Sequence, residues 1–256
     1  MTVAFCQSAV EMGRRWLGWM ALQREDLGEA ERDFTNAAGT GWREWVAGRK
    51  AFVSGNYREA AAQYRKAVDL SPKDEPASFA ERLGPPWNYP SRLTDLGAAQ
   101  VLAGDTAAAI ATLDTAAKAQ PENARVLYLR ARAKELAGQM EPALADYNLA
   151  SRTAYAAARD LASGEAHLYR GILLYRRKDY SHAEDEFASA LNFEIPASLR
   201  PDAVAWRHLA AVAAGSCEAS RQNLERSLTA TSPFFPKDEA RKISAACPTT
   251  TAGTRR

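Results

Sequence analysis

Residues 48–67 read GRKAFVSGNYREAAAQYRKA, and Pro72 follows five residues after the last alanine. The same order of residue types returns from Gly97 onward. In both stretches a small residue is followed after seven positions by Gly. An Ala, a bulky residue, an Ala and a Pro then follow, and the distances between them are the same in the two stretches. The second stretch places them at Gly104, Ala109, Leu113, Ala116 and Pro121. One unit of structure therefore occurs at least twice in the chain.

Further copies flank these two. A third copy carries Gly138, a fourth carries Lys178 in place of the glycine, and an N-terminal copy carries Gly18. Gly104 and Gly138 are 34 residues apart, and this period, with this order of residues, resembles the tetratricopeptide repeat family. The resemblance covers about residues 11–230 and implies an all-α fold, a right-handed α-solenoid of stacked antiparallel helix pairs.

The residue types support helix pairs independently of the family. Ala60, Tyr64 and Ala67 lie at i, i+4 and i+7, which is one face of a helix. Gly55 occupies a position at which a helix has to end in a left-handed residue. Small residues such as Gly48 and Gly97 lie where two helices would cross closely. Each pair has more apolar surface than it can bury alone, so we expect neighbouring pairs to stack.

The repeat pattern also predicts the organisation of the chain. We expect an N-terminal lead-in over 1–10, a solenoid of about five to six pairs over 11–230 with an insertion at 73–89, a C-terminal capping segment over 231–247 and a disordered tail over 248–256. The insertion has two interpretations. It is either a long inter-repeat loop or a segment whose Trp87 and Tyr89 cap one end of a binding groove.

Composition limits the classes of partner. The chain has 256 residues, 46% hydrophobic residues and a formal net charge of +2, so we expect a folded protein that does not bind nucleic acid. No run approaches ~20 consecutive apolar residues, so no membrane span is expected. Residues 1–7 lack the pattern of a signal peptide. The compartment stays open between cytoplasm and periplasm, and the abundance of Ala and Arg suggests a bacterial protein.

The chain has three cysteines, Cys6, Cys217 and Cys247, whose spacing fits neither a zinc site nor a CxxC motif. One interpretation is three reduced thiols. The other is a Cys217–Cys247 disulfide that fixes the C-terminal segment to the last helix pair, which would indicate an oxidising compartment such as the periplasm. The sequence does not choose between them, because a disulfide requires a specific Cα separation.

We find no catalytic motif of the serine-hydrolase, zinc-protease or nucleotide-binding kinds. His167, His182 and His208 fall in separate predicted helices, whereas catalysis or metal binding needs convergent side chains. We therefore expect a non-enzyme with no catalytic residues, no metal and no cofactor.

The family resemblance implies a partner site. Members of the family usually bind an extended peptide or a partner helix in a concave groove lined by the first helix of each pair. The corresponding positions here are Arg15, Trp19, Trp45, Arg49, Arg125, Tyr128, Arg132, Tyr175, Arg176 and Arg207. Arginine and aromatic residues dominate binding hot spots, so an acidic segment with apolar anchors is the predicted ligand. Trp45 has a second interpretation as inter-repeat core. The asparagines that chaperone-binding members use are missing, so chaperone-tail recognition is not expected.

These observations predict a protein–protein interaction scaffold or adaptor. The alternatives are the regulatory repeat region of a larger enzyme and one component of a multi-protein cell-envelope assembly. Leftover apolar surface on the terminal pairs also leaves a homo-oligomer open.

Overall fold

The computed structural model of the chain describes residues 14, 17–18, 20–21, 26–35, 41–71, 89–154, 161–193, 195–231 and 235–247. The predicted lead-in, the tail and nearly all of the insertion at 73–89 lie outside these residues. The described segments contain helices and no strands. None of these helices is both long and apolar enough to cross a lipid bilayer.

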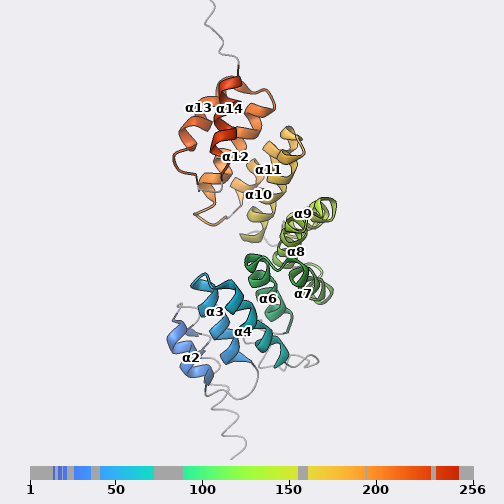
Figure 1. Cartoon of the computed structure of the whole chain (residues 1–256), viewed down its shortest axis with the longest axis vertical. Coiled ribbons are helices and arrows are strands. Elements are labelled where there is room, and N and C mark those ends of the chain that lie inside the picture. The colour runs from blue at the N-terminus through green and yellow to red at the C-terminus, as the bar shows by residue number, and fades with distance from the viewer. Residues whose placement is uncertain are drawn as a thin grey trace, which may run out of the picture. The chain divides into compact units, whose positions relative to one another are not determined.

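The chain divides into two compact units, Met1–Pro121 and Glu122–Arg256. The first contains α2 (Leu27–Thr35), α3 (Trp42–Val53), α4 (Tyr57–Asp69), α6 (Tyr89–Ala103) and α7 (Thr106–Ala119). The second contains α8 (Ala124–Leu136), α9 (Met140–Ala154), α10 (Leu161–Arg176), α11 (Tyr180–Asn192), α12 (Arg200–Ala213), α13 (Cys217–Ser227) and α14 (Lys237–Ala246). Figure 1 shows the helices of each unit running as consecutive hairpins.

The helix pairs follow the repeat at the positions that the sequence predicts. Within the first unit α3 packs on α4 and α6 on α7, while α4 also contacts α6. Within the second unit α8 packs on α9, α10 on α11 and α12 on α13. Contacts between α9 and α10 and between α11 and α12 join these pairs into a stack. The prediction of an all-α fold made of stacked helix pairs is therefore confirmed.

The glycines at the predicted crossings lie against large buried side chains. A Cβ on Gly48 would come within 2.6 Å of the Tyr64 ring, and one on Gly97 would come within 2.5 Å of Leu113. Tyr64 and Leu113 are fully or almost fully buried. The first helix of each of these pairs can therefore approach the second only because its crossing residue has no side chain.

The turn inside each pair needs a left-handed residue, as the sequence predicts. Gly55, Gly104 and Gly138 have φ angles of +76°, +81° and +77°. Lys178, which replaces the glycine in the fourth copy, adopts the same conformation with φ +65°. The helices that follow Gly55 and Gly104 begin with similar caps, in which the side chains of Asn56 and Asp105 accept backbone N–H groups. The turn geometry is thus a property of the repeat rather than of glycine alone.

The C-terminal helix α14 has no second helix of its own among the described residues. It packs against α12 and α13. Phe235, just before it, makes an edge contact with the Trp206 ring, with centroids 5.1 Å apart. A disulfide joins Cys217 at the start of α13 to Cys247 just after α14, across a Cα separation of 5.6 Å. The apolar core of the last pair is therefore covered by an unpaired helix that is covalently attached.

Candidate functional site

The first helices of the second unit form a contiguous row. Helix α10 contacts α8 on one side and α12 on the other. This row carries six of the ten predicted groove residues: Arg125, Tyr128 and Arg132 on α8, Tyr175 and Arg176 on α10, and Arg207 on α12. The row therefore carries most of the predicted binding surface.

A buried carboxylate organises the row. The side chain of Glu135, only 4% exposed, accepts hydrogen bonds from three helices. Arg132 of α8 forms a close ion pair with it, the Tyr147 hydroxyl of α9 donates to it at 2.8 Å, and Arg176 of α10 donates at 3.1 Å. A buried carboxylate without such partners would be strongly unfavourable, so these contacts satisfy Glu135 and fix both arginines around it.

The tyrosine beside this carboxylate is a permanent donor. Burial, and next the Glu135 carboxylate, raise the pKa of the Tyr147 hydroxyl well above its ordinary value. Tyr147 therefore stays protonated at physiological pH, and α9 keeps one hydrogen bond to Glu135 under all such conditions.

The two arginines at Glu135 have different surroundings. The Arg132 side chain is 21% exposed and its guanidinium carbon lies 4.0 Å from the centre of the Tyr169 ring. It is thus held by an ion pair and by a cation–π contact. The Arg176 side chain is 58% exposed and donates one N–H to Glu135. A guanidinium has five donors, so Arg176 is positioned by the core and still presents N–H groups to solvent.

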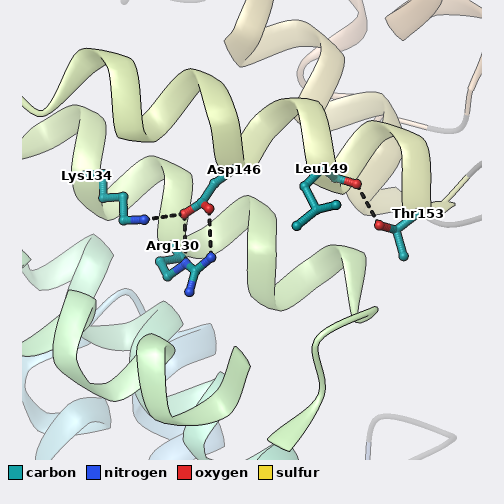
Figure 2. Close-up of polar contacts among 5 residues, drawn as sticks. All are labelled: Arg130, Lys134, Asp146, Leu149 and Thr153. Carbon is teal, nitrogen blue, oxygen red and sulfur yellow. Dashed lines mark hydrogen bonds and ion pairs between the residues drawn. The ribbon is translucent and has the colours of Figure 1, made fainter. Parts of the chain in front are cut away.

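The rest of the basic cluster on α8 is neutralised from inside the pair. Figure 2 shows Asp146 of α9 accepting from both Arg130 and Lys134. Arg130 makes two contacts of 2.7 Å with the two carboxylate oxygens, and Lys134 makes one of 2.8 Å. The Asp146 side chain is 8% exposed. These two cations therefore hold α8 against α9, and Arg125, at the start of α8, is exposed beyond them.

The predicted aromatic residues of the row are largely covered. Tyr128 and Tyr175 are 8% and 5% exposed. Tyr128 lies near the rings of both Tyr147 and Tyr169, at centroid distances of 6.3 and 5.9 Å. The Tyr175 hydroxyl donates to Glu239 of α14 at 3.0 Å. Both rings therefore contribute to packing, and the exposed members of the predicted set on this row are arginines.

In the first unit, two predicted residues are described. Trp45 is 8% exposed and its indole N–H donates to Asp95 at 2.8 Å, which ties α3 to α6. Arg49 lies with its guanidinium carbon 6.0 Å from the Phe52 ring centre. The burial of Trp45 agrees with its interpretation as inter-repeat core. Arg15 and Trp19 lie outside the described residues.

The histidines occupy three different helices. His167 on α10 contacts Glu186 at 2.9 Å, and His182 at the start of α11 contacts Asp179 at 2.8 Å. His208 on α12 is partly buried, and this burial lowers its pKa. Over the described ranges, no three His, Cys, Asp or Glu side chains converge in a way that could hold a metal ion.

Stacked antiparallel helix pairs with left-handed turn residues and small residues at the crossings define an α-helical repeat protein. Residues 94–157 match the family model described as tetratricopeptide repeat. These residues are tetratricopeptide repeats, and the chain has the fold of that family. No curated protein matches the chain in sequence.

Solved structures share this fold at low sequence identity. The thermophilic TPR protein TTC0263 of Thermus thermophilus is 17% identical, with a TM-score of 0.53 over 80% of this chain and 97% of that one. A chain of the APC/C hetero-tetramer Cut9–Hcn1 is 14% identical, with a TM-score of 0.68 over 90% of this chain and 42% of that one. The Rap conjugation gene regulator of plasmid pLS20, solved with the Phr* peptide, is 15% identical, with a TM-score of 0.57 over 83% and 58%.

Proposed function

We propose that this chain is a protein–protein interaction scaffold that binds an extended peptide or a partner helix along the row formed by α8, α10 and α12. The observation that carries the proposal is Arg176, whose side chain is held on the buried Glu135 and is nevertheless 58% exposed. A guanidinium that is already positioned loses little conformational freedom when it binds a carboxylate, and this favours recognition over a mobile surface arginine.

Two further cations extend this surface. Arg125 on α8 and Arg207 on α12 are exposed, and their helices are the two neighbours of α10 in the row. A partner that follows the row would therefore meet arginines on three consecutive first helices. The ligand class that fits is an acidic segment, because arginine forks bind carboxylates through two parallel hydrogen bonds. The side chains that pack underneath this surface, on its protein-facing side, are those of Arg132, Tyr128 and Tyr175.

The fold relatives are compatible with this proposal. The pLS20 Rap structure contains a peptide, and Cut9 is part of a hetero-tetramer with Hcn1. At 15% and 14% identity these likenesses concern the fold alone, so they support a binding role in general and do not identify a ligand for this chain.

The disulfide supports a second part of the proposal, which concerns the compartment. Structural disulfides persist in oxidising compartments and are rare in the cytosol. We therefore propose that the chain works in the periplasm or a similar compartment, as a component of a cell-envelope assembly. Mass spectrometry of alkylated protein from the native source would test this. Unmodified, bridged Cys217 and Cys247 are expected, and quantitative alkylation of both would contradict it.

The binding proposal is tested by placing a photo-crosslinking amino acid at single positions in cells. The row positions are Leu136 on α8, four residues after Arg132, and Val204 on α12, three residues before Arg207, so that the arginines of the row stay in place. At both positions we expect a discrete crosslinked product with another protein. Matched controls carry the crosslinker at Asn148 on α9 and Asp185 on α11, which are exposed positions on second helices. Equal products from all four positions, or none from the first two, would contradict binding along the row.

A further inference from the structure

A cleft of about 670 Å³ lies between α13 and α14, and the described residues that line it are outside the row. Its lining includes Arg221, Glu225 and Leu228 from the side of α13, and Lys237, Arg241 and Ser244 from α14. This volume is in the range in which proteins bind small ligands or a few residues of a peptide. Three of these six side chains are cationic and one is anionic, so the cleft has an excess of positive charge.

The three cations have donors to spare. Within the described part of the chain, the Lys237 ammonium donates once, to the carbonyl of Thr231 at 3.1 Å. Arg241 donates once, to Asp238 at 3.1 Å, and its side chain is 65% exposed. Arg221 lies 3.7 Å from Glu225 in a loose ion pair. An ammonium has three donors and a guanidinium five, so each cation keeps N–H groups for a ligand.

This is a different situation from that of the cations on α8. Arg130 and Lys134 share a carboxylate that is 8% exposed, and Arg132 contacts one that is 4% exposed. Their charge is balanced inside the fold. The carboxylates that pair with the cleft cations are different: Asp238, the partner of Arg241, is 92% exposed, and Glu225, the partner of Arg221, is 57% exposed. These carboxylates are well solvated and bind their cations weakly. A ligand carboxylate can therefore compete for the cations of the cleft.

The walls of the cleft are fixed to each other. The disulfide Cys217–Cys247 ties the start of α13 to the end of α14. Ser244, which is buried, donates from α14 to Glu225 of α13 at 3.0 Å. Both connections cross between the two helices, so the backbones that carry the cations are held together before any ligand arrives, which lowers the cost of binding.

We propose that the cleft between α13 and α14 binds a carboxylate-bearing peptide segment of a partner protein. Its cations match carboxylates, while Leu228 offers an apolar contact for the neighbouring part of a peptide. The whole chain has a net charge of only +2, which also fits a local acidic segment better than a long polyanion. This site is separate from the row and does not depend on it.

Fluorescence anisotropy with the full chain, disulfide intact, tests the proposal. The probe is fluorescein-labelled hexaglutamate, with identically labelled hexaglutamine as the neutral control. We expect hexaglutamate to bind about tenfold or more tightly than hexaglutamine, and the Lys237→Gln/Arg241→Gln variant to lose about tenfold or more of this affinity. Arg152→Gln removes an exposed arginine on α9 that belongs to neither proposed surface, so it should change the affinity by less than about twofold. Affinity that is lost in Arg176→Gln and kept in Lys237→Gln/Arg241→Gln would place hexaglutamate on the row and overturn the proposal for the cleft.

A second variant keeps the test decisive if the double variant is unstable. In Glu225→Gln the side chain can still accept from Ser244, but the negative charge of Glu225 is removed from the lining of the cleft. The affinity for hexaglutamate should therefore rise by about twofold or more. Unchanged affinity in both Lys237→Gln/Arg241→Gln and Glu225→Gln overturns the proposal. So does labelled oligouridylate that binds as tightly as hexaglutamate and is lost in the same variant, because the site would then be a general polyanion site.

Discussion

The helix pairs α8–α9 and α10–α11 share the same repeat architecture but differ in the residues of their interiors. Adding 40 to a residue number in the first pair gives its counterpart in the second, as from Gly138 to Lys178. The bridge between the two helices is kept in this register. Arg130 pairs with Asp146 at 2.7 Å, and Arg170 pairs with Glu186 at 2.9 Å. This link between first and second helix therefore belongs to the repeat and not to one copy.

The interiors differ at the crossing and beside it. The first pair crosses at Ala131 and Tyr147, and the Tyr147 hydroxyl reaches the buried Glu135. In the second pair the residues that correspond to these three are Gly171, Phe187 and Tyr175. There the Phe187 ring stacks on Trp206, with centroids 5.9 Å apart. The polar interior of the first pair thus holds arginines at the surface. The apolar interior of the second pair instead packs against α12.

The largest expected effect follows from removing Glu135. Glu135→Ala should lower the free energy of unfolding by about 3–5 kcal/mol, because Arg132 and the Tyr147 hydroxyl would remain buried without their partner. The control at the corresponding position is Tyr175→Phe, which removes only the contact with Glu239 and should cost about 1 kcal/mol. Urea titrations measure both. Equal losses would mean that Glu135 does not organise the polar interior.

The bridge that both pairs share gives the second comparison. Asp146→Asn should cost about 2–3 kcal/mol, since Arg130 and Lys134 would lose a carboxylate that is 8% exposed. Glu186→Gln should cost less, about 1–2 kcal/mol, because Glu186 pairs with the arginine Arg170, whereas Asp146 pairs with both an arginine and a lysine. The comparison would fail if thermal and urea unfolding showed the larger loss for Glu186→Gln.

The residues at which the helices of a pair cross give the third comparison. A Cβ on Gly171 would lie 2.7 Å from the Phe187 ring, and Phe187 is completely buried. Gly171→Ala should therefore cost about 1–2 kcal/mol of stability even though Ala favours a helix by about 1 kcal/mol. The control is Gly28→Ala in α2, where the nearest atom is 3.5 Å away and the residue is exposed, so stability should not fall. A stabilised Gly171→Ala would show that the ring can move aside.

The repeat itself was predictable because it depends on backbone requirements that only a few residue types meet. A left-handed turn and a close crossing call for small residues at fixed spacing, and these could be found in one sequence. The partners of Arg132 and Arg130 could not be predicted from the sequence. Their contacts with Glu135 and Asp146 depend on which side-chain rotamer reaches the carboxylate. Glu135 lies on a helix predicted to line the groove, and nothing in its spacing distinguishes a buried carboxylate from an exposed one.

The smallest expected effect concerns the turn. Lys178 holds φ +65° where Gly138 holds +77°, and both residues are exposed. No atom lies within 4 Å of a Cβ placed on Gly138, so space does not distinguish the two turns and only backbone strain does. Lys178→Gly should raise the free energy of unfolding by about 0.5–1 kcal/mol, because relief of the left-handed strain exceeds the extra flexibility of glycine in the unfolded chain.

The reciprocal change, Gly138→Lys, should lower the free energy of unfolding by a similar amount. A chain that carries both substitutions then compares the two turns directly. If its midpoint of urea unfolding is unchanged while each single variant shifts the midpoint in the stated direction, the two turns are energetically equivalent. The two copies would then differ in stability only through their interiors, the polar one around Glu135 and the apolar one around Phe187. A double variant that unfolds earlier than the unsubstituted chain would instead show that the turn of the first pair tolerates a side chain less well.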